Sequence, residues 1–143
     1  MSSFPWRRQK IAGARPNPAH HALAKLEKDK PSYLLVTQNV DGLHELAGCR
    51  EIVELHGNIW RLRCVTCKER RADRTTPLPD IPPHCSCGAL MRPDVVWFGE
   101  GLPFDAISAA ISAARNCDLF LAIGTSAIVQ PAASLPLEAA QRR

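Results

Sequence analysis

Residues 33–48 read YLLVTQNVDGLHELAG, and this stretch decides the expected fold. The apolar run at 33–37 is typical of a strand buried on both faces, and the residues after it predict a short helix that ends at Gly48. A second apolar run, CDLFLAIG at 117–124, predicts another fully buried strand, with a last helix opening at Pro131. Two apolar strands, each followed by a helix, predict parallel βα units and therefore an α/β fold.

Composition limits the classes of function that fit the chain. Its 143 residues suffice for one domain with a small appended module, and 45% apolar with 22% charged residues is ordinary for a globular protein. The net charge of +4 is mild and the basic residues are scattered, so we interpret them as solvated and expect no nucleic-acid partner. No apolar run approaches the roughly 20 residues of a membrane span, and MSSFPWRRQK lacks a signal-peptide core. We therefore expect a cytoplasmic protein without a membrane partner.

Four cysteines form two tight pairs. Cys64 and Cys67 make a C-x-x-C pair, and Cys85 and Cys87 make a C-x-C pair further along the chain. Local pairs outside a secretory context favour metal over disulfides, and zinc takes about four such soft ligands in a tetrahedron. His84, which precedes Cys87 by three residues, competes with Cys85 as the third ligand. With all four positions filled by protein, the site would hold one structural zinc ion.

The cysteines also suggest how the chain is divided. Residues 60–92 interrupt the βα pattern, and a proline-rich loop at 72–84 lies within them. We interpret 60–92 as an inserted zinc-binding module, and 1–59 with 93–143 as one partial sheet-and-helix domain.

Polar residues follow both apolar runs, where ligands bind in open α/β sheets. These are Gln38, Asn39 and Asp41 after the first run, and Gly124, Thr125 and Ser126 after the second. The G-T-S turn could bind phosphate or ribose oxygens or could be a plain turn, and Asp41 could instead cap the next helix. His56 and His44 are both candidate bases, and their spacing does not decide between them.

Taken together, these motifs resemble the sirtuin family of NAD-dependent protein deacylases. The matching strings are TQNVDGLH, ELHGNIWRLRC, CGALMRPDVVWFGE and CDLFLAIGTSAIVQPAA, in the family's order, and the resemblance runs from about Trp6 to Pro136. It implies a partial Rossmann-like sheet with an inserted zinc module, with NAD and acyl-lysine proteins or peptides as partners.

The resemblance also implies roles for individual residues. His56 matches the catalytic base, and Cys64 with Cys67 begins the zinc module. The polar residues after the two apolar runs match the nicotinamide–ribose pocket and a cofactor-contacting turn. A third group, Val95, Val96, Trp97, Phe98 and Gly99, matches the strand that pairs with the substrate backbone and covers the acyl-lysine tunnel. Val96 and Trp97 could alternatively be plain core residues.

The family's reaction follows from the same resemblance. The acyl-lysine carbonyl oxygen attacks the nicotinamide ribose and releases nicotinamide. The histidine then deprotonates the ribose hydroxyls, so that the 2′-hydroxyl attacks the resulting imidate. The products are free lysine and O-acyl-ADP-ribose.

The departures from the family pattern matter as well. The family opens with a strand and a G-A-G-x-S turn, and it continues to an asparagine-bearing loop near the cofactor; neither is in this sequence. We therefore expect an internal fragment that is impaired on its own; the alternative is a non-catalytic remnant that still binds zinc and peptide. Sirtuins that remove succinyl or malonyl groups carry a tyrosine–arginine pair; Arg7 matches the arginine, whereas Phe4 stands at the tyrosine and lacks its hydroxyl. Arg7 could therefore bind an acidic acyl chain, or Phe4 to Trp6 could simply be a frayed terminus.

Overall fold

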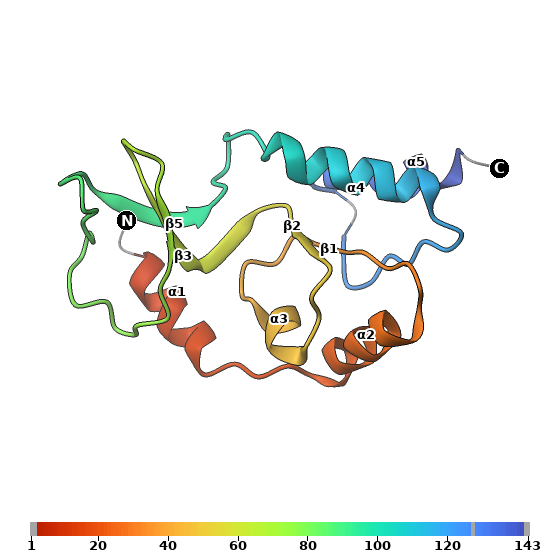
Figure 1. Ribbon diagram of the computed structural model, residues 1–143, viewed down its shortest axis with the longest axis horizontal. Helices are drawn as coiled ribbons and strands as arrows, with labels where there is room; N and C mark the ends of the chain where they lie inside the picture. The colour runs from red at the N-terminus through yellow and green to blue at the C-terminus, as the bar shows by residue number, and fades with distance from the viewer. Residues whose placement is uncertain (1–2, 127, 142–143) are drawn as a thin grey trace.

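Two small β-sheets organise the computed structural model, which describes residues 3–126 and 128–141 (Figure 1). In the first sheet, β1 (Leu35–Thr37) runs parallel to β2 (Ile52–Glu54). In the second, β3 (Gly57–Cys64) lies between β4 (Arg70–Ala72) and β5 (Met91–Val95), and both pairings are antiparallel. The parallel pair connected through a helix confirms the expected α/β class.

Local sequence signals set two of the helices. The helix α2 (Pro18–Asp29) begins after Asn17, whose Oδ1 accepts hydrogen bonds from the N–H groups of Ala19 at 2.9 Å and His20 at 3.2 Å. The helix α3 (Leu43–Ala47) ends at Gly48, which has φ +105° and returns its N–H to the last turn. Both ends lie where the cap residues predict them.

The C-terminal helices cover the parallel sheet. The helix α4 (Phe104–Asn116) packs beside α5 (Leu135–Ala140), which follows the 3₁₀ turn η1 (Ala132–Ser134) (Figure 1). Small side chains let these elements approach closely, in a core cluster made of Leu55, Ala110, Ala114, Ala132 and Leu135. None of the helices in the described ranges has the length and apolar character needed to cross a bilayer.

The first helix, α1 (Ser3–Ala12), was not expected from the sequence, and it corrects the interpretation of the basic residues as solvated. Arg8 is only 1% exposed. Its Nη1 donates to the carbonyl of Ile59 at 3.1 Å, its Nη2 pairs with Asp73 Oδ1 at 2.6 Å, and its guanidinium lies 5.0 Å from the Trp60 ring centroid. Burial lowers the pKa of Arg8, and the Asp73 carboxylate opposes that shift. This arginine therefore attaches α1 to the antiparallel sheet.

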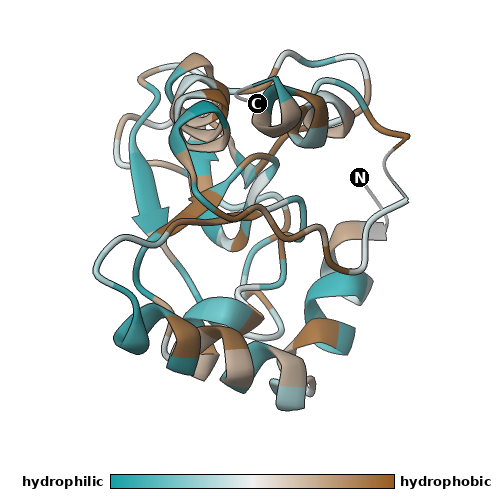
Figure 2. Cartoon of the chain, turned by 90° about the vertical axis from the view of Figure 1, so that its right-hand side faces the viewer, coloured by the Kyte–Doolittle hydropathy of each residue, from teal (hydrophilic) through white to brown (hydrophobic). Residues whose placement is uncertain are grey.

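The predicted second buried strand, at 117–124, is wrong. Residues 117–123 form an extended hydrophobic coil (Figure 2) in which Leu119 is 73%, Leu121 54% and Ile123 58% exposed. A strand forms only where a neighbouring strand satisfies its backbone. Within the described ranges, β1 pairs only with β2, and the backbone of 118–124 makes no hydrogen bond to other backbone groups.

Candidate functional site

The polar residues after the two apolar runs meet in space although they are far apart in sequence. Gln38 follows β1, and its Nε2 donates to Thr125 Oγ1 at 3.3 Å. Thr125 lies with Ser126 in an exposed stretch after Gly124, whose φ of +63° suits a tight turn. Asn39 is exposed beside Gln38. This hydrogen bond brings the segment after β1 and the turn at 124–126 together.

The Asp41 side chain makes a local turn just before α3. Its Oδ1 accepts the Leu43 N–H at 2.9 Å at the start of α3, and its carbonyl oxygen accepts the Trp60 indole N–H at 2.7 Å. Gly42, which lies between Asp41 and Leu43, has φ +71°, and a Cβ at this position would lie 3.1 Å from the Trp60 ring. These contacts fix the backbone of the 38–42 loop in a turn before α3, whose N-cap position is Gly42.

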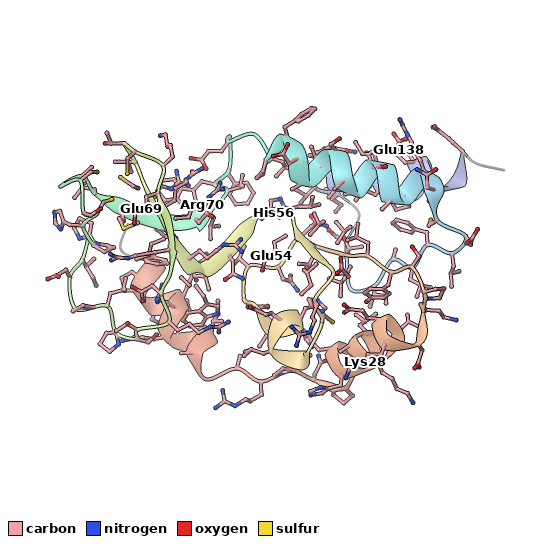
Figure 3. The ribbon with its side chains drawn as sticks, viewed as in Figure 1. Lys28, Glu54, His56, Glu69, Arg70 and Glu138 are labelled. Carbon is pink, nitrogen blue, oxygen red and sulfur yellow. The ribbon has the colours of Figure 1, made fainter. Side chains whose placement is uncertain are left out.

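His56 lies between β2 and β3 (Figure 3), and its hydrogen bond defines its tautomer. Its Nδ1 is 3.1 Å from the carbonyl oxygen of Gln38. A carbonyl oxygen only accepts, so Nδ1 carries the proton and Nε2 of the neutral ring keeps its lone pair. His56 is thus arranged to accept a proton at Nε2. The other candidate base, His44, has no partner for its buried Nδ1 among the described residues.

The segment after β5 is connected directly to His56. The N–H of Val96 donates to the carbonyl of His56 at 2.9 Å, and Val95 pairs with Gly57 in the antiparallel ladder. Val95 and Val96 are half-buried, whereas Trp97 is 47% exposed and Phe98 fully exposed. Gly99 has φ +86° and turns the chain toward α4. Two exposed aromatic side chains and the candidate base therefore belong to one connected unit.

Gly57 permits the close approach of β3 and β5 beside His56. It has φ +78°, and a Cβ built there would lie 2.0 Å from the carbonyl oxygen of Asp94. Only glycine fits that space. Glycine after His56 is the sequence signal for this contact, although spacing alone did not reveal it.

The four cysteines form a second centre at the other end of the antiparallel sheet, where the sulfur atoms lie near Glu69 in Figure 3. Their Sγ atoms all lie within 4.8 Å of one another, and the Cys64–Cys87 and Cys67–Cys85 distances are both 3.6 Å. Thiolates about 2.3 Å from one tetrahedral zinc ion are about 3.8 Å apart. The cysteine set therefore fits one structural zinc ion.

Two details support the cysteine set. Burial opposes ionisation of Cys64, but hydrogen bonds from the N–H groups of Thr66 and Cys67 and from neighbouring thiols bring its pKa down to about 6. A thiolate is the form that binds metal. His84 is exposed and pairs by backbone with Leu90, outside the sulfur group, so the grouping favours Cys85 over His84.

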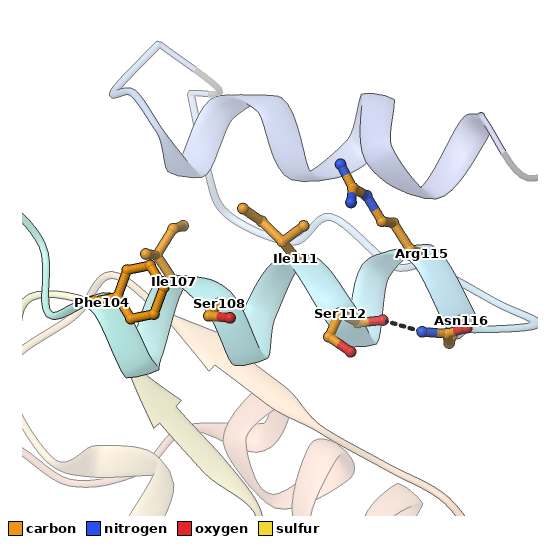
Figure 4. Close-up of a pocket in the computed structure, with 7 residues that line it drawn as sticks. All are labelled: Phe104, Ile107, Ser108, Ile111, Ser112, Arg115 and Asn116. Atoms are coloured by element: carbon orange, nitrogen blue, oxygen red, sulfur yellow. Dashed lines mark hydrogen bonds between the residues drawn. The ribbon is translucent and has the colours of Figure 1, made fainter.

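Arg7 and Phe4 stand apart from the His56 unit in their contacts. Phe4 packs against the apolar cluster around the cysteines, and the Arg8 guanidinium lies 5.9 Å from its ring centroid. Arg7 is exposed on α1. An open hollow of about 410 Å³ runs along α4 (Figure 4), and none of the predicted site residues lines it.

Comparison with known proteins places these features in a family. The Sir2 family model matches residues 3–131. The chain belongs to the Sir2 family. An NAD-dependent protein deacylase of Aquifex aeolicus is 54% identical over 137 residues, which are 95% of this chain and 57% of that protein. A deacylase of the same name from Thermus thermophilus is 53% identical over 140 residues, covering 92% of this chain and 53% of that protein.

Solved Sir2 structures share the fold. A Sir2 homologue in complex with NAD superposes with a TM-score of 0.91 at 46% identity, covering 97% of this chain and 55% of that one. A Sir2 protein bound to an acetylated peptide gives 0.84 at 37% identity, covering 93% and 58%. These likenesses confirm the expected sirtuin resemblance and its α/β fold. The chain spans little more than half the length of the relatives that it matches.

Proposed function

We propose that these 143 residues carry the base, the peptide-binding segment and the zinc module of an NAD-dependent protein-lysine deacylase. The observation that carries the proposal is the hydrogen bond from His56 Nδ1 to the Gln38 carbonyl, which leaves Nε2 free as a base beside the 95–99 segment. The deacylase names of the relatives, and the NAD and acetylated-peptide complexes of Sir2 structures, support the reaction class.

Each group of residues has a proposed task in this reaction. Bound NAD would supply an electrophilic ribose carbon, whose bond to nicotinamide would break as the acyl-lysine oxygen bonds to it, releasing nicotinamide. His56 Nε2 would then accept the proton of a ribose hydroxyl. A general base of this kind typically raises the reaction rate by about 10²–10⁴-fold. Gln38, Asn39 and Asp41 would face the nicotinamide ribose, and the turn at 124–126 would contact the cofactor. The segment 95–99 would pair with the substrate backbone, a mode that tolerates many peptide sequences.

The zinc ion would be structural. Cys64, Cys67, Cys85 and Cys87 would fill its four positions, so no coordination site would be left for an activated water. We assign 60–92 to the zinc-binding module and 1–59 with 93–143 to the partial Rossmann-like domain. Reduced cysteines suit a reducing compartment, so we also propose a cytoplasmic location, which cell fractionation would test.

The decisive experiment mixes the purified, zinc-loaded chain with NAD and an acetyl-lysine peptide and follows nicotinamide and O-acyl-ADP-ribose by mass spectrometry. We expect slow turnover, because in the described part of the chain the backbone of the coil at 118–123, which leads into the cofactor-side turn at 124–126, makes no hydrogen bond to other backbone groups. The same coil favours a second candidate, a zinc-bearing module that binds acyl-peptide without catalysis. Peptide binding with no NAD-dependent product would support that candidate.

The acyl class can be tested separately. Arg7 is exposed, so its guanidinium is available for a charge-assisted contact with a distal carboxylate. We propose that Arg7 favours succinyl- over acetyl-lysine. Equal handling of the two peptides, unchanged by Arg7→Ala, would contradict this.

A further inference from the structure

The loop that links β5 to α4 displays its aromatic side chains yet has an ordered set of polar contacts. Phe98 is fully exposed and Trp97 is 47% exposed. Such a loop gains little from apolar burial, so its conformation depends on other contacts. Two charged residues at its ends, Arg92 on β5 and Glu100 before α4, supply them.

The two residues form a bidentate pair. Arg92 Nη1 donates to Glu100 Oε1 at 2.5 Å, and Nη2 donates to Oε2 at 2.9 Å. The Arg92 side chain is only 15% exposed, and its guanidinium lies 3.7 Å from the Trp97 ring centroid. A planar guanidinium that both pairs and stacks has little freedom to rotate. Hydrogen bonds from Arg92 lower the pKa of Glu100 to about 2, and the Trp97 N–H contributes to the same shift.

The pair also binds the loop backbone from both sides. Arg92 Nη2 donates to the carbonyl of Val95 at 2.7 Å, and Glu100 Oε2 accepts the N–H of Trp97 at 3.0 Å. The N–H of Glu100 returns to the carbonyl of Trp97 at 2.9 Å. The backbone groups of Phe98, which lies in the turn at 98–99, make no backbone hydrogen bonds within the described chain and remain open to a bound peptide.

We propose that Arg92 and Glu100 are positioning residues that hold the 95–99 segment in the shape that receives an acyl-lysine peptide. The inference rests on the proposed function, because it assumes that this segment is where the peptide pairs. The clamp satisfies the Val95 carbonyl and the Trp97 N–H, and within the described chain it leaves the backbone groups of Phe98 without a backbone partner. It therefore lowers the ordering cost of binding an extended peptide.

The test uses the zinc-loaded chain with Glu100→Gln and Arg92→Lys. Glu100→Gln keeps the side-chain shape and an oxygen for the Trp97 N–H but removes the charge, and Arg92→Lys removes the bidentate geometry and the stacking. We expect each variant to bind an acetyl-lysine peptide at least about tenfold more weakly by calorimetry, with zinc content and thermal midpoint unchanged. Amide hydrogen exchange across 96–100 should accelerate.

The matched control is Arg115→Gln, which breaks the Arg115–Glu138 pair of 2.7 Å between α4 and α5. It should leave peptide affinity and exchange at 96–100 as in the wild type. Unchanged exchange in Glu100→Gln would overturn the clamp itself. Faster exchange with unchanged affinity would overturn its role in binding. A wild-type chain that does not bind the acyl-peptide, while exchange responds as expected, would place the failure in the proposed function.

Discussion

Replacing Gly57 with alanine should destabilise the fold beside the candidate base, because of all the glycines it leaves the least room for a Cβ. The new Cβ would lie 2.0 Å from the Asp94 carbonyl oxygen, 2.9 Å from its carbon and 3.2 Å from Val95 Cα. These are backbone atoms of a paired strand, so they cannot move aside as a flexible side chain would. The β3–β5 ladder must open next to His56.

Three costs contribute to the loss of stability. Left-handed backbone at φ +78° costs a non-glycine residue about 1–2 kcal/mol. A lost ladder hydrogen bond costs about 1 kcal/mol, and forcing a methyl group into packed structure costs about 1–3 kcal/mol. Together they reduce the free energy of unfolding by about 3–6 kcal/mol, a large part of the usual total of about 5–15 kcal/mol.

Urea and thermal unfolding of the zinc-loaded chain, followed by circular dichroism, measure this loss. The Gly57→Ala midpoint should fall by at least about 6 °C. Gly101→Ala is the matched control, because nothing lies within 4 Å of a Cβ there and no left-handed φ is recorded, so its stability should stay within about 0.5 kcal/mol. If Gly57→Ala were as stable as the control, the close approach of β3 and β5 would be refuted.

Two further perturbations test the cysteine centre and the α2–α3 contact. Cys85→Ser should abolish stoichiometric zinc binding, whereas His84→Ala should retain it. Metal analysis of protein purified without chelator measures this. The reverse result would make His84 the ligand. Burial, and then the neighbouring His20, lower the pKa of His44 below its usual 6.5, so the unfolded chain binds this proton more readily. This contribution to the free energy of unfolding is present above about pH 6.5 and is lost as the pH falls below it. His44→Gln should therefore make the free energy of unfolding decline less steeply at low pH. His21→Gln, at an exposed position, is the control and should leave that decline unchanged.

The features that the sequence predicted correctly depend on neighbouring residues. The Gly48 helix end and the grouping of Cys85 with Cys87 each follow from chemistry within a few residues. The four ordered strings that resemble sirtuins then gave the family, because motif order carries information that no single motif has.

The features that the sequence did not predict depend mostly on partners far along the chain. An apolar run at 117–124 has strand composition, but composition supplies no neighbouring strand, and the run is exposed coil in the described chain. Arg8 lies in a basic cluster that would ordinarily be solvated, yet residues far along the chain, such as Asp73, surround it. Arg92 and Glu100 are only eight residues apart, but their spacing alone does not show that the loop between them brings the two side chains together.

The central claim is that His56 Nε2 is the proton acceptor of an NAD-dependent deacylation. The most direct measurement compares O-acyl-ADP-ribose formed by the wild-type chain and by His56→Ala, with NAD and acetyl-lysine peptide at equal concentrations. We predict slow but NAD-dependent product from the wild type and at least about a 100-fold lower rate for His56→Ala, with peptide affinity within about twofold. Product that forms without NAD, or at the same rate in His56→Ala, would contradict the account.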